Sequence, residues 1–128
     1  MNQRNRRLRP GYAQDTSLRM MFWGGQDRAN RTFGVADSYE QKTGVRIEGE
    51  FMAFSDYWPK LATLTAGGNG PDVVQMDGAG RYVADYARRG AIAPLDEFLG
   101  NALKLDGFDQ DQLDAGKVVV AGVTSSVA

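Results

Sequence analysis

The sequence contains no cysteine and no histidine among its 128 residues. These absences exclude disulfide bonds, thiol chemistry, zinc sites built from cysteine or histidine, and every catalytic triad that needs a histidine base. Long apolar runs are also missing, since no stretch approaches the roughly 18 to 20 consecutive apolar residues of a membrane-spanning helix. We therefore expect no metal site of that kind and no direct insertion into a membrane.

Positive charge is scarce outside the N-terminus. The formal net charge is −1, and Arg4, Arg6, Arg7 and Arg9 place four positive charges in the first nine residues, which leaves −5 for the rest of the chain. A nucleic-acid-binding face would continue such arginines across a folded surface with interleaved aromatic residues. The body instead collects four aspartates between residues 106 and 114, so we expect no nucleic-acid partner.

Residues 1–16 form a basic leader that is similar to an export signal but lacks its apolar part. Gly11-Tyr12-Ala13 places small residues where a signal peptidase accepts them. Only Leu8 stands where 7 to 15 apolar residues are normally required. Either the signal is altered or the likeness is accidental, and we expect poor export of this polypeptide.

Apolar patterns alternate between strand and helix along the body of the chain. Strands are predicted at residues 18–23, 45–51 and within 70–77, and helices at residues 28–43, from 56 onward, at 81–89 and as a short turn at 96–99. Strands that alternate with helices of this length predict an α/β fold with a mainly parallel sheet in βαβαβα order.

Capping residues mark the predicted helix boundaries. Asp27 and Asp56 are predicted N-caps, and the second of these would place Pro59 at the third helical position, where a missing N–H costs no intrahelical bond. Gly44 and Gly90 are predicted to end the helices that precede them.

Five segments, in this order, resemble the extracellular solute-binding proteins of family 1, which are the carbohydrate-binding receptors of ABC importers. They are residues 18–25, 33–45, 57–61, 70–74 and 86–95. The resemblance implies a periplasmic-binding-protein-like fold, a periplasmic location, a sugar ligand and an ABC permease as partner. It also implies a two-lobed receptor that closes over its ligand by hinge motion, performs no chemistry and needs no cofactor.

Receptors of that family are much longer than this chain. The resemblance therefore implies that residues 17–117 form a partial N-terminal lobe, followed by a divergent tail at 118–128 that departs from the family's Gly-Tyr-Gly-like turn. We expect a truncated or frame-changed chain that captures a sugar weakly or not at all when alone.

Candidate ligand residues follow the three predicted strands, where open α/β sheets hold ligands. A sugar offers hydroxyl groups that are both donors and acceptors and apolar C–H faces, so its site needs amides, carboxylates and aromatic planes. The candidates are Trp23, Gly24, Gly25 and Gln26 on the first loop, Tyr57 on the second, and Met76, Asp77 and Gly78 on the third.

Each candidate also has a structural interpretation. Trp23 can be a core aromatic that ends a strand, Gly24 and Gly25 a plain turn, and Asp77 the cap of the next helix. Trp58 has helical spacing to Leu61 and is predicted to be core. Asp72 is predicted to tie down the glycine-rich loop before it.

Two other classes of function stay open. Glycine-rich turns invite a nucleotide-binding enzyme or a small flavodoxin-like interaction domain. However, the glycines at 67–70 precede a strand, and Gly78-Ala79-Gly80 lacks the third glycine of the dinucleotide fingerprint.

Overall fold

The computed structural model describes residues 16–77, 81–102, 104–120 and 123–126. The chain divides into two compact units, Met1–Gln75 and Met76–Ala128. Residues 1–15 of the predicted leader lie outside the described residues, and so does Gly78, one of the candidate ligand residues.

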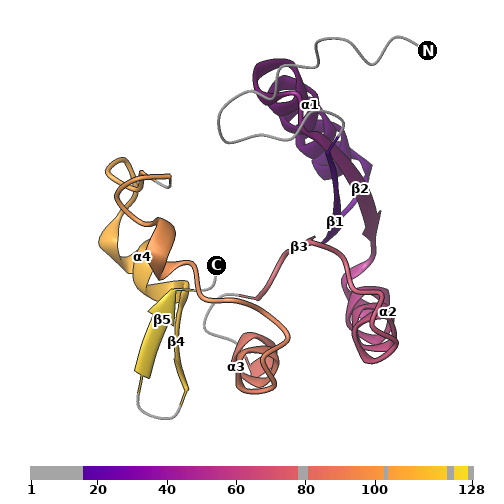
Figure 1. Cartoon of the computed structure of the whole chain (residues 1–128). Helices are drawn as coiled ribbons and strands as arrows, with labels where there is room; N and C mark the ends of the chain where they lie inside the picture. The colour runs from indigo at the N-terminus through magenta and orange to yellow at the C-terminus, as the bar shows by residue number, and fades with distance from the viewer. Residues whose placement is uncertain (1–15, 78–80, 103, 121–122, 127–128) are drawn as a thin grey trace, which may run out of the picture. The chain divides into compact units, whose positions relative to one another are not determined.

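The first unit is built on a three-stranded parallel sheet with the order β2-β1-β3. The central strand β1 (Ser17–Trp23) pairs with β2 (Arg46–Met52) on one side and β3 (Val73–Val74) on the other, as Figure 1 shows. Phe22 lies opposite Phe51, and Met21 opposite Val74. The predicted α/β fold with parallel strands is confirmed in this unit.

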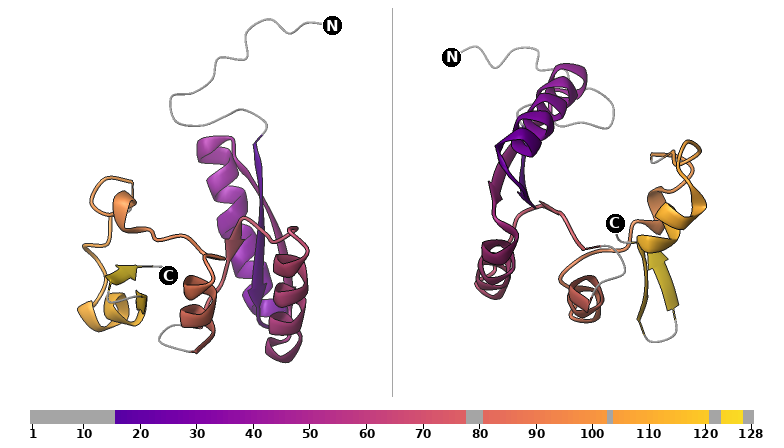
Figure 2. Two further views of the ribbon diagram at one scale, coloured as in Figure 1. Left: turned by 60° about the horizontal axis from the view of Figure 1, so that its bottom comes forward. Right: turned by 180° about the vertical axis from the view of Figure 1, so that it is seen from behind.

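Two helices cover opposite faces of this sheet. Helix α1 (Gln26–Thr43) connects β1 to β2, and α2 (Phe54–Ala66) connects β2 to β3 (Figure 2). Successive strand residues point to opposite faces, so Phe22 meets Phe33 of α1 while Trp23 meets Tyr57 of α2. The crossover from β1 to β2 and the crossover from β2 back past β1 to β3 run in opposite directions across the sheet. Because both are right-handed, their helices lie on opposite faces.

The core on the α1 face is a cluster of three phenylalanines. The ring centroid of Phe22 lies 5.9 Å from that of Phe33 and 5.8 Å from that of Phe51. Gly49 makes room for them, because a Cβ there would lie 2.7 Å from the Phe33 ring. Sheet and helix therefore approach closely at this point.

The core on the α2 face contains Met21, Tyr57 and Leu61, all of which are buried. The Tyr57 hydroxyl lies 3.0 Å from the Met21 carbonyl oxygen and 2.9 Å from the Gln75 carbonyl oxygen. One hydroxyl thus links α2 to β1 and to the segment that follows β3. Trp58 is buried beside Leu61, as its spacing predicted.

Both predicted N-caps are wrong. The N-cap of α1 is Gly25 and that of α2 is Ala53, both in extended conformation and without a side-chain cap. The chain passes from each strand almost directly into the next helix, so α2 starts early enough for Phe54 to pack against Trp23. Pro59 consequently lies inside α2 rather than at its third position. The predicted ends at Gly44 and Gly90 are confirmed, both in left-handed conformation.

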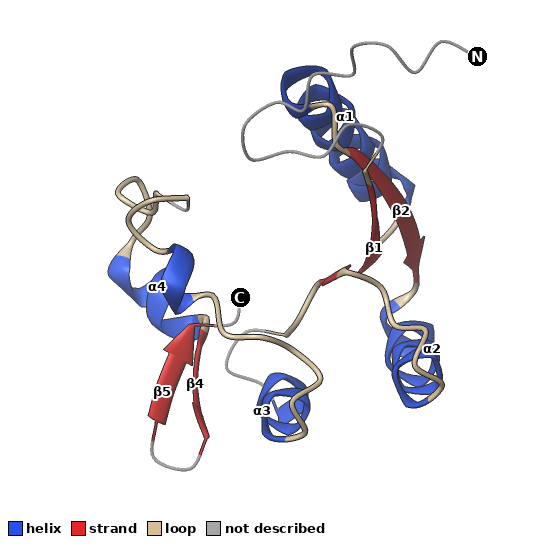
Figure 3. Cartoon of the chain, viewed as in Figure 1, coloured by secondary structure: helices blue, strands red, loops and turns tan. Residues whose placement is uncertain are grey.

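The third strand is shorter than its sequence suggests and comprises only Val73–Val74 (Figure 3). Asp72 anchors its start, because the Asp72 carboxylate accepts the Arg19 N–H at 2.8 Å and the Asp72 N–H donates to the Arg19 carbonyl at 2.9 Å. The Arg19 guanidinium in turn donates to Asn69 of the glycine-rich loop. Asp72 therefore fastens the end of that loop to β1, in line with its predicted role.

The second unit contains short elements. These are α3 (Arg81–Arg88), the 3-10 helix η1 (Asp96–Phe98), α4 (Gln110–Ala115), β4 (Lys117–Val120) and β5 (Val123–Ser126). Helix α3 and η1 match the predicted helices. Strands β4 and β5 pair antiparallel, with Lys117 opposite Ser126 (Figure 3). Neither this hairpin nor α4 was predicted from the sequence.

Asp114 ties the end of α4 to the start of β4. Its Oδ1 accepts hydrogen bonds from Lys117 Nζ at 2.6 Å and from Gln110 Nε2 at 2.8 Å. The bond from Lys117, followed by that from Gln110, lowers the pKa of Asp114 below its ordinary 3.8. A carboxylate whose pKa falls on folding stabilises the fold above its unfolded pKa, and this contribution is lost as pH falls through the folded pKa.

We expect Lys117→Met to raise the pKa of Asp114 toward its ordinary value, because the largest cause of the shift is removed. A carboxyl-detected NMR titration of the variant would measure this. Lys104→Met is the matched control in the same unit and should leave Asp114 unchanged. An unchanged pKa in Lys117→Met would show that Gln110 or the backbone holds the carboxylate instead.

Candidate functional site

Trp23 ends the central strand and stands at the carboxyl edge of the sheet. It is half-buried, and its ring is flanked by those of Phe54, Tyr57 and Trp58 at centroid distances of 5.3, 5.1 and 5.5 Å. The backbone N–H of Trp23 donates to the Gln75 Oε1 at 3.2 Å. Trp23 therefore packs among three aromatic neighbours, while the residue stays partly exposed to solvent.

The glycines after Trp23 form a tight passage from β1 into α1. Gly24 has a φ of +146°, and its N–H donates to the Met52 carbonyl at 3.0 Å. Gly25 is exposed, and its carbonyl accepts the Ala29 N–H at 3.1 Å, which starts α1. The helix therefore begins directly beside the Trp23 ring, and the backbone there is open to a ligand.

Gln26 is the first residue of α1 and is exposed. Its Nε2 donates to the Asn30 Oδ1 at 2.8 Å, one turn along the helix. No side chain makes a cap hydrogen bond at this end of α1 within the described part of the chain. The N-terminus of an uncapped helix favours oxygen atoms and negative charge.

The structure brings Trp23, Gly24, Gly25 and Gln26 together on one rim, which we call the β1–α1 rim. Tyr57 lies below this rim and is fully buried with its hydroxyl at the Met21 and Gln75 carbonyls. It supports the Trp23 ring from inside. Phe54 is the aromatic residue of α2 that reaches solvent, with half of its surface exposed.

The remaining candidates belong to the second unit. Met76 is buried, and Asp77 is half-buried. The Asp77 Oδ1 accepts the Val83 N–H in the first turn of α3 at 3.3 Å. This is the capping role that the sequence offered as the alternative to ligand binding.

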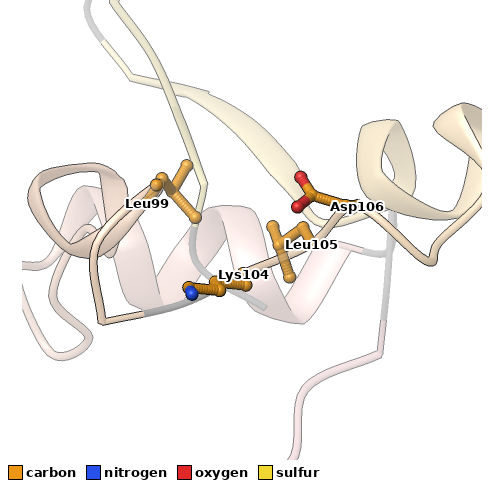
Figure 4. A pocket seen from close by; sticks show the side chains of 5 residues that line it. Leu99, Lys104, Leu105 and Asp106 are labelled. Atoms are coloured by element: carbon orange, nitrogen blue, oxygen red, sulfur yellow. The ribbon is translucent and has the colours of Figure 1, made fainter.

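Two of the hollows found among the described residues are lined without any residue of the β1–α1 rim. One, of about 420 Å³, lies on the α1 face of the first unit and is lined mainly by apolar side chains, including Leu18, Val35 and Tyr39. The other, of about 230 Å³, lies in the second unit, where Lys104 and Asp106 accompany Leu99 and Leu105 (Figure 4). Both charged side chains of the second hollow are exposed. Neither hollow combines an aromatic plane with fixed polar groups as the rim does.

Sequence reasoning missed two residues of the rim. Arg28 carries its guanidinium carbon 6.0 Å from the Trp23 ring centroid. Gln75 orients the strand end through its side-chain oxygen. The sequence did contain a signal for Arg28. A cation in the first turn of a helix interacts unfavourably with the helix dipole, so its presence there indicates another role.

The comparison with family models identifies one family. A family model described as bacterial extracellular solute-binding protein matches residues 26–124. The matched range includes both helices of the first unit, part of the rim, and β4 with the start of β5.

Solved structures of the same kind share the fold. An extracellular solute-binding protein family 1 from Alicyclobacillus acidocaldarius is 27% identical with a TM-score of 0.73, over 87% of this chain and 27% of that one. A periplasmic oligogalacturonide binding protein from Yersinia enterocolitica, in complex with saturated digalacturonic acid, is 25% identical with a TM-score of 0.68, over 84% of this chain and 26% of that one. An ABC transporter solute-binding protein from Thermotoga lettingae, bound with alpha-D-tagatose, is 24% identical with a TM-score of 0.65, over 79% of this chain and 26% of that one. This chain thus spans about a quarter of the length of these structures.

Proposed function

The chain belongs to the bacterial extracellular solute-binding protein family, and from this premise we propose that its β1–α1 rim is one wall of a carbohydrate site used for ABC-type import. The observation that carries the proposal is the Trp23 ring, held by three aromatic neighbours and left partly open beside the uncapped start of α1.

Each part of the rim suits a different feature of a sugar. The open part of the Trp23 ring suits the apolar C–H face of a pyranose, and the Gln26 amide suits a hydroxyl that both donates and accepts. Gly25 is exposed and carries no side chain, so the backbone there can approach the ligand closely, whereas the stem of Arg28 lies over Gly24. Met76 and Asp77 belong to the second unit and stay predictions separate from the rim, with the Asp77 carboxylate as the predicted acceptor of hydroxyl hydrogen bonds.

The solved structures support a sugar as the ligand class. The Yersinia protein, at 25% identity, was solved with a galacturonide. We propose an ABC permease as the partner of the whole receptor and the periplasm as its place of action. Within the described residues, no helix is both long and apolar enough to cross a membrane.

A single wall predicts weak binding. Each hydrogen bond made there competes with water and contributes a net of about 0.5 to 1.5 kcal/mol. A few such bonds and one stacked ring correspond to a dissociation constant of about 1 mM. Closure by a second lobe would exclude water and tighten the site.

NMR titration of the 128-residue chain with mono- and disaccharides is the test of this function. We expect the Gly24 and Gly25 amides and the Trp23 indole N–H to shift on addition of sugar. Trp23→Ala should abolish the shifts at Gly24 and Gly25, whereas Tyr39→Ala, a partly exposed aromatic residue in the middle of α1, should retain them.

Two results would contradict the proposal. Sugar-induced shifts confined to the Leu99–Asp106 region would place the site elsewhere in the chain. Shifts at the rim with ATP or NAD, but with no sugar, would favour a nucleotide-binding domain.

A further inference from the structure

Arg28 is placed against the rim by its neighbours. It lies in the first turn of α1 and is exposed, and its guanidinium carbon stands 6.0 Å from the Trp23 ring centroid. Its aliphatic stem runs over Gly24, because a Cβ at Gly24 would lie 2.6 Å from Arg28 Cδ and 3.2 Å from Arg28 Cβ. The absence of a side chain at Gly24 thus leaves the room that the stem occupies.

The guanidinium of Arg28 makes no ion pair with any described residue. The described ion pairs join Arg46 to Glu48, Lys60 to Glu50, Arg89 to Asp85 and Lys117 to Asp114. Asp27 is the neighbouring acidic residue, but adjacent residues of a helix do not face each other. The positive charge beside Trp23 is therefore not neutralised by a carboxylate of the described chain.

The start of α1 adds to this charge. The helix has 18 residues, and its first turn has no side-chain cap hydrogen bond within the described residues. Its dipole favours an anion at this end, and a fixed guanidinium can bind a carboxylate with two parallel hydrogen bonds. An anion-binding group thus stands over the Trp23 ring, with its guanidinium carbon 6.0 Å from the ring centroid.

A uronic acid matches this pair of features. Its pyranose ring has an apolar face for Trp23, and its carboxylate replaces the hydroxymethyl group of the matching neutral hexose. A hydroxymethyl group gives Arg28 only a neutral acceptor, whereas a carboxylate gives it a charge-assisted pair. We propose that the β1–α1 rim selects acidic sugars and that Arg28 is the specificity-determining residue, an inference that rests on the proposed carbohydrate function.

The test compares sugars that differ only at this group. The 128-residue chain is titrated with D-glucuronate against D-glucose and with D-galacturonate against D-galactose, and dissociation constants are taken from the Gly24 and Gly25 amide shifts. At least one uronate should bind about fivefold more tightly than its neutral counterpart, as an exposed charge pair allows. Added salt should weaken uronate binding and leave neutral sugar binding unchanged.

In Arg28→Gln, the ratio of the neutral sugar's dissociation constant to that of its uronate, which we call the uronate preference, should fall to about one. The affinity for the neutral sugar should stay unchanged. Arg31→Gln is the matched control, since Arg31 lies one turn along on the same helix and its Nε donates to the Asp27 carbonyl. It should retain the preference. Because both arginines are exposed, neither substitution should affect folding, which the amide spectrum would verify.

The outcomes separate this inference from the function on which it rests. If neutral sugars shift the rim but uronates bind no better, or if Arg28→Gln keeps the preference, the inference is wrong and the carbohydrate function stands. Acetate shifting the rim as strongly as uronate would also overturn it, since the site would then be a simple anion site. If no sugar shifts the rim, both are wrong.

Discussion

Replacing Phe22 with alanine is expected to lower the free energy of unfolding by about 3–5 kcal/mol. Phe22 is 2% exposed and packs against Phe33 of α1 and Phe51 of β2. Its removal leaves a cavity between the central strand and the helix that covers it. Since small domains are stable by only about 5–15 kcal/mol, this one substitution removes a large part of the total.

Urea denaturation followed by circular dichroism would measure the effect. Phe22→Leu keeps most of the volume and should cost less than about 1.5 kcal/mol. Phe108→Ala removes an aromatic ring that is more than half exposed and should change stability by less than about 0.5 kcal/mol. Equal losses for Phe22→Ala and Phe108→Ala would contradict the core described above.

The elements of the first unit could be predicted because their signals are local. The helix that ends at Gly44 shows a periodic apolar stripe, and the glycine that follows has the left-handed conformation its position requires. The strand over residues 18–23 shows a short apolar run beside glycines. The order of the elements then determines the parallel sheet and the faces that the helices cover.

Helix starts and the length of β3 could not be predicted in the same way. Asp27 and Asp56 are good caps by residue type, yet both helices begin earlier. In α2, packing of Phe54 against Trp23 favours the earlier start. Strand β3 comprises only two residues, although the N–H groups of Asp72 and Gln75 on either side of it still donate to the Arg19 and Met21 carbonyls of β1. Such choices depend on residues that are distant in sequence.

The candidate site likewise has parts that the sequence could predict and parts that it could not. Sequence placed Trp23, Gly24, Gly25 and Gln26 at the end of one strand, and the structure shows them on one rim. It could not decide how far Tyr57 is buried, because burial depends on where α2 lies over the sheet. Nor could it place the stem of Arg28 over Gly24, because that contact depends on an unusual backbone conformation.

Gly24→Ala is expected to lower the free energy of unfolding by about 1–3 kcal/mol. A φ of +146° is a conformation that residues with a Cβ rarely adopt, and the new methyl group would meet Arg28 Cδ at 2.6 Å. The adjacent Gly25 provides the control. It has a φ of −88°, and a Cβ there would meet nothing within 4 Å. Serine is a preferred N-cap residue, so Gly25→Ser should be neutral or slightly stabilising.

Gly24→Ala also tests whether Gly24 positions Arg28. If the stem of Arg28 needs the space above Gly24, the methyl group must displace it. Gly24→Ala should then lose the uronate preference as Arg28→Gln does, although the arginine is still present. Gly34→Ala, which adds a methyl group in the middle of α1 where nothing lies within 4 Å, should keep the preference. Urea denaturation and the paired sugar titrations measure the two effects separately. If Gly24→Ala is as stable as Gly25→Ser, the chain relaxes without strain at this turn. If Gly24→Ala is destabilised but keeps the uronate preference, the charge of Arg28 acts without its position over Gly24.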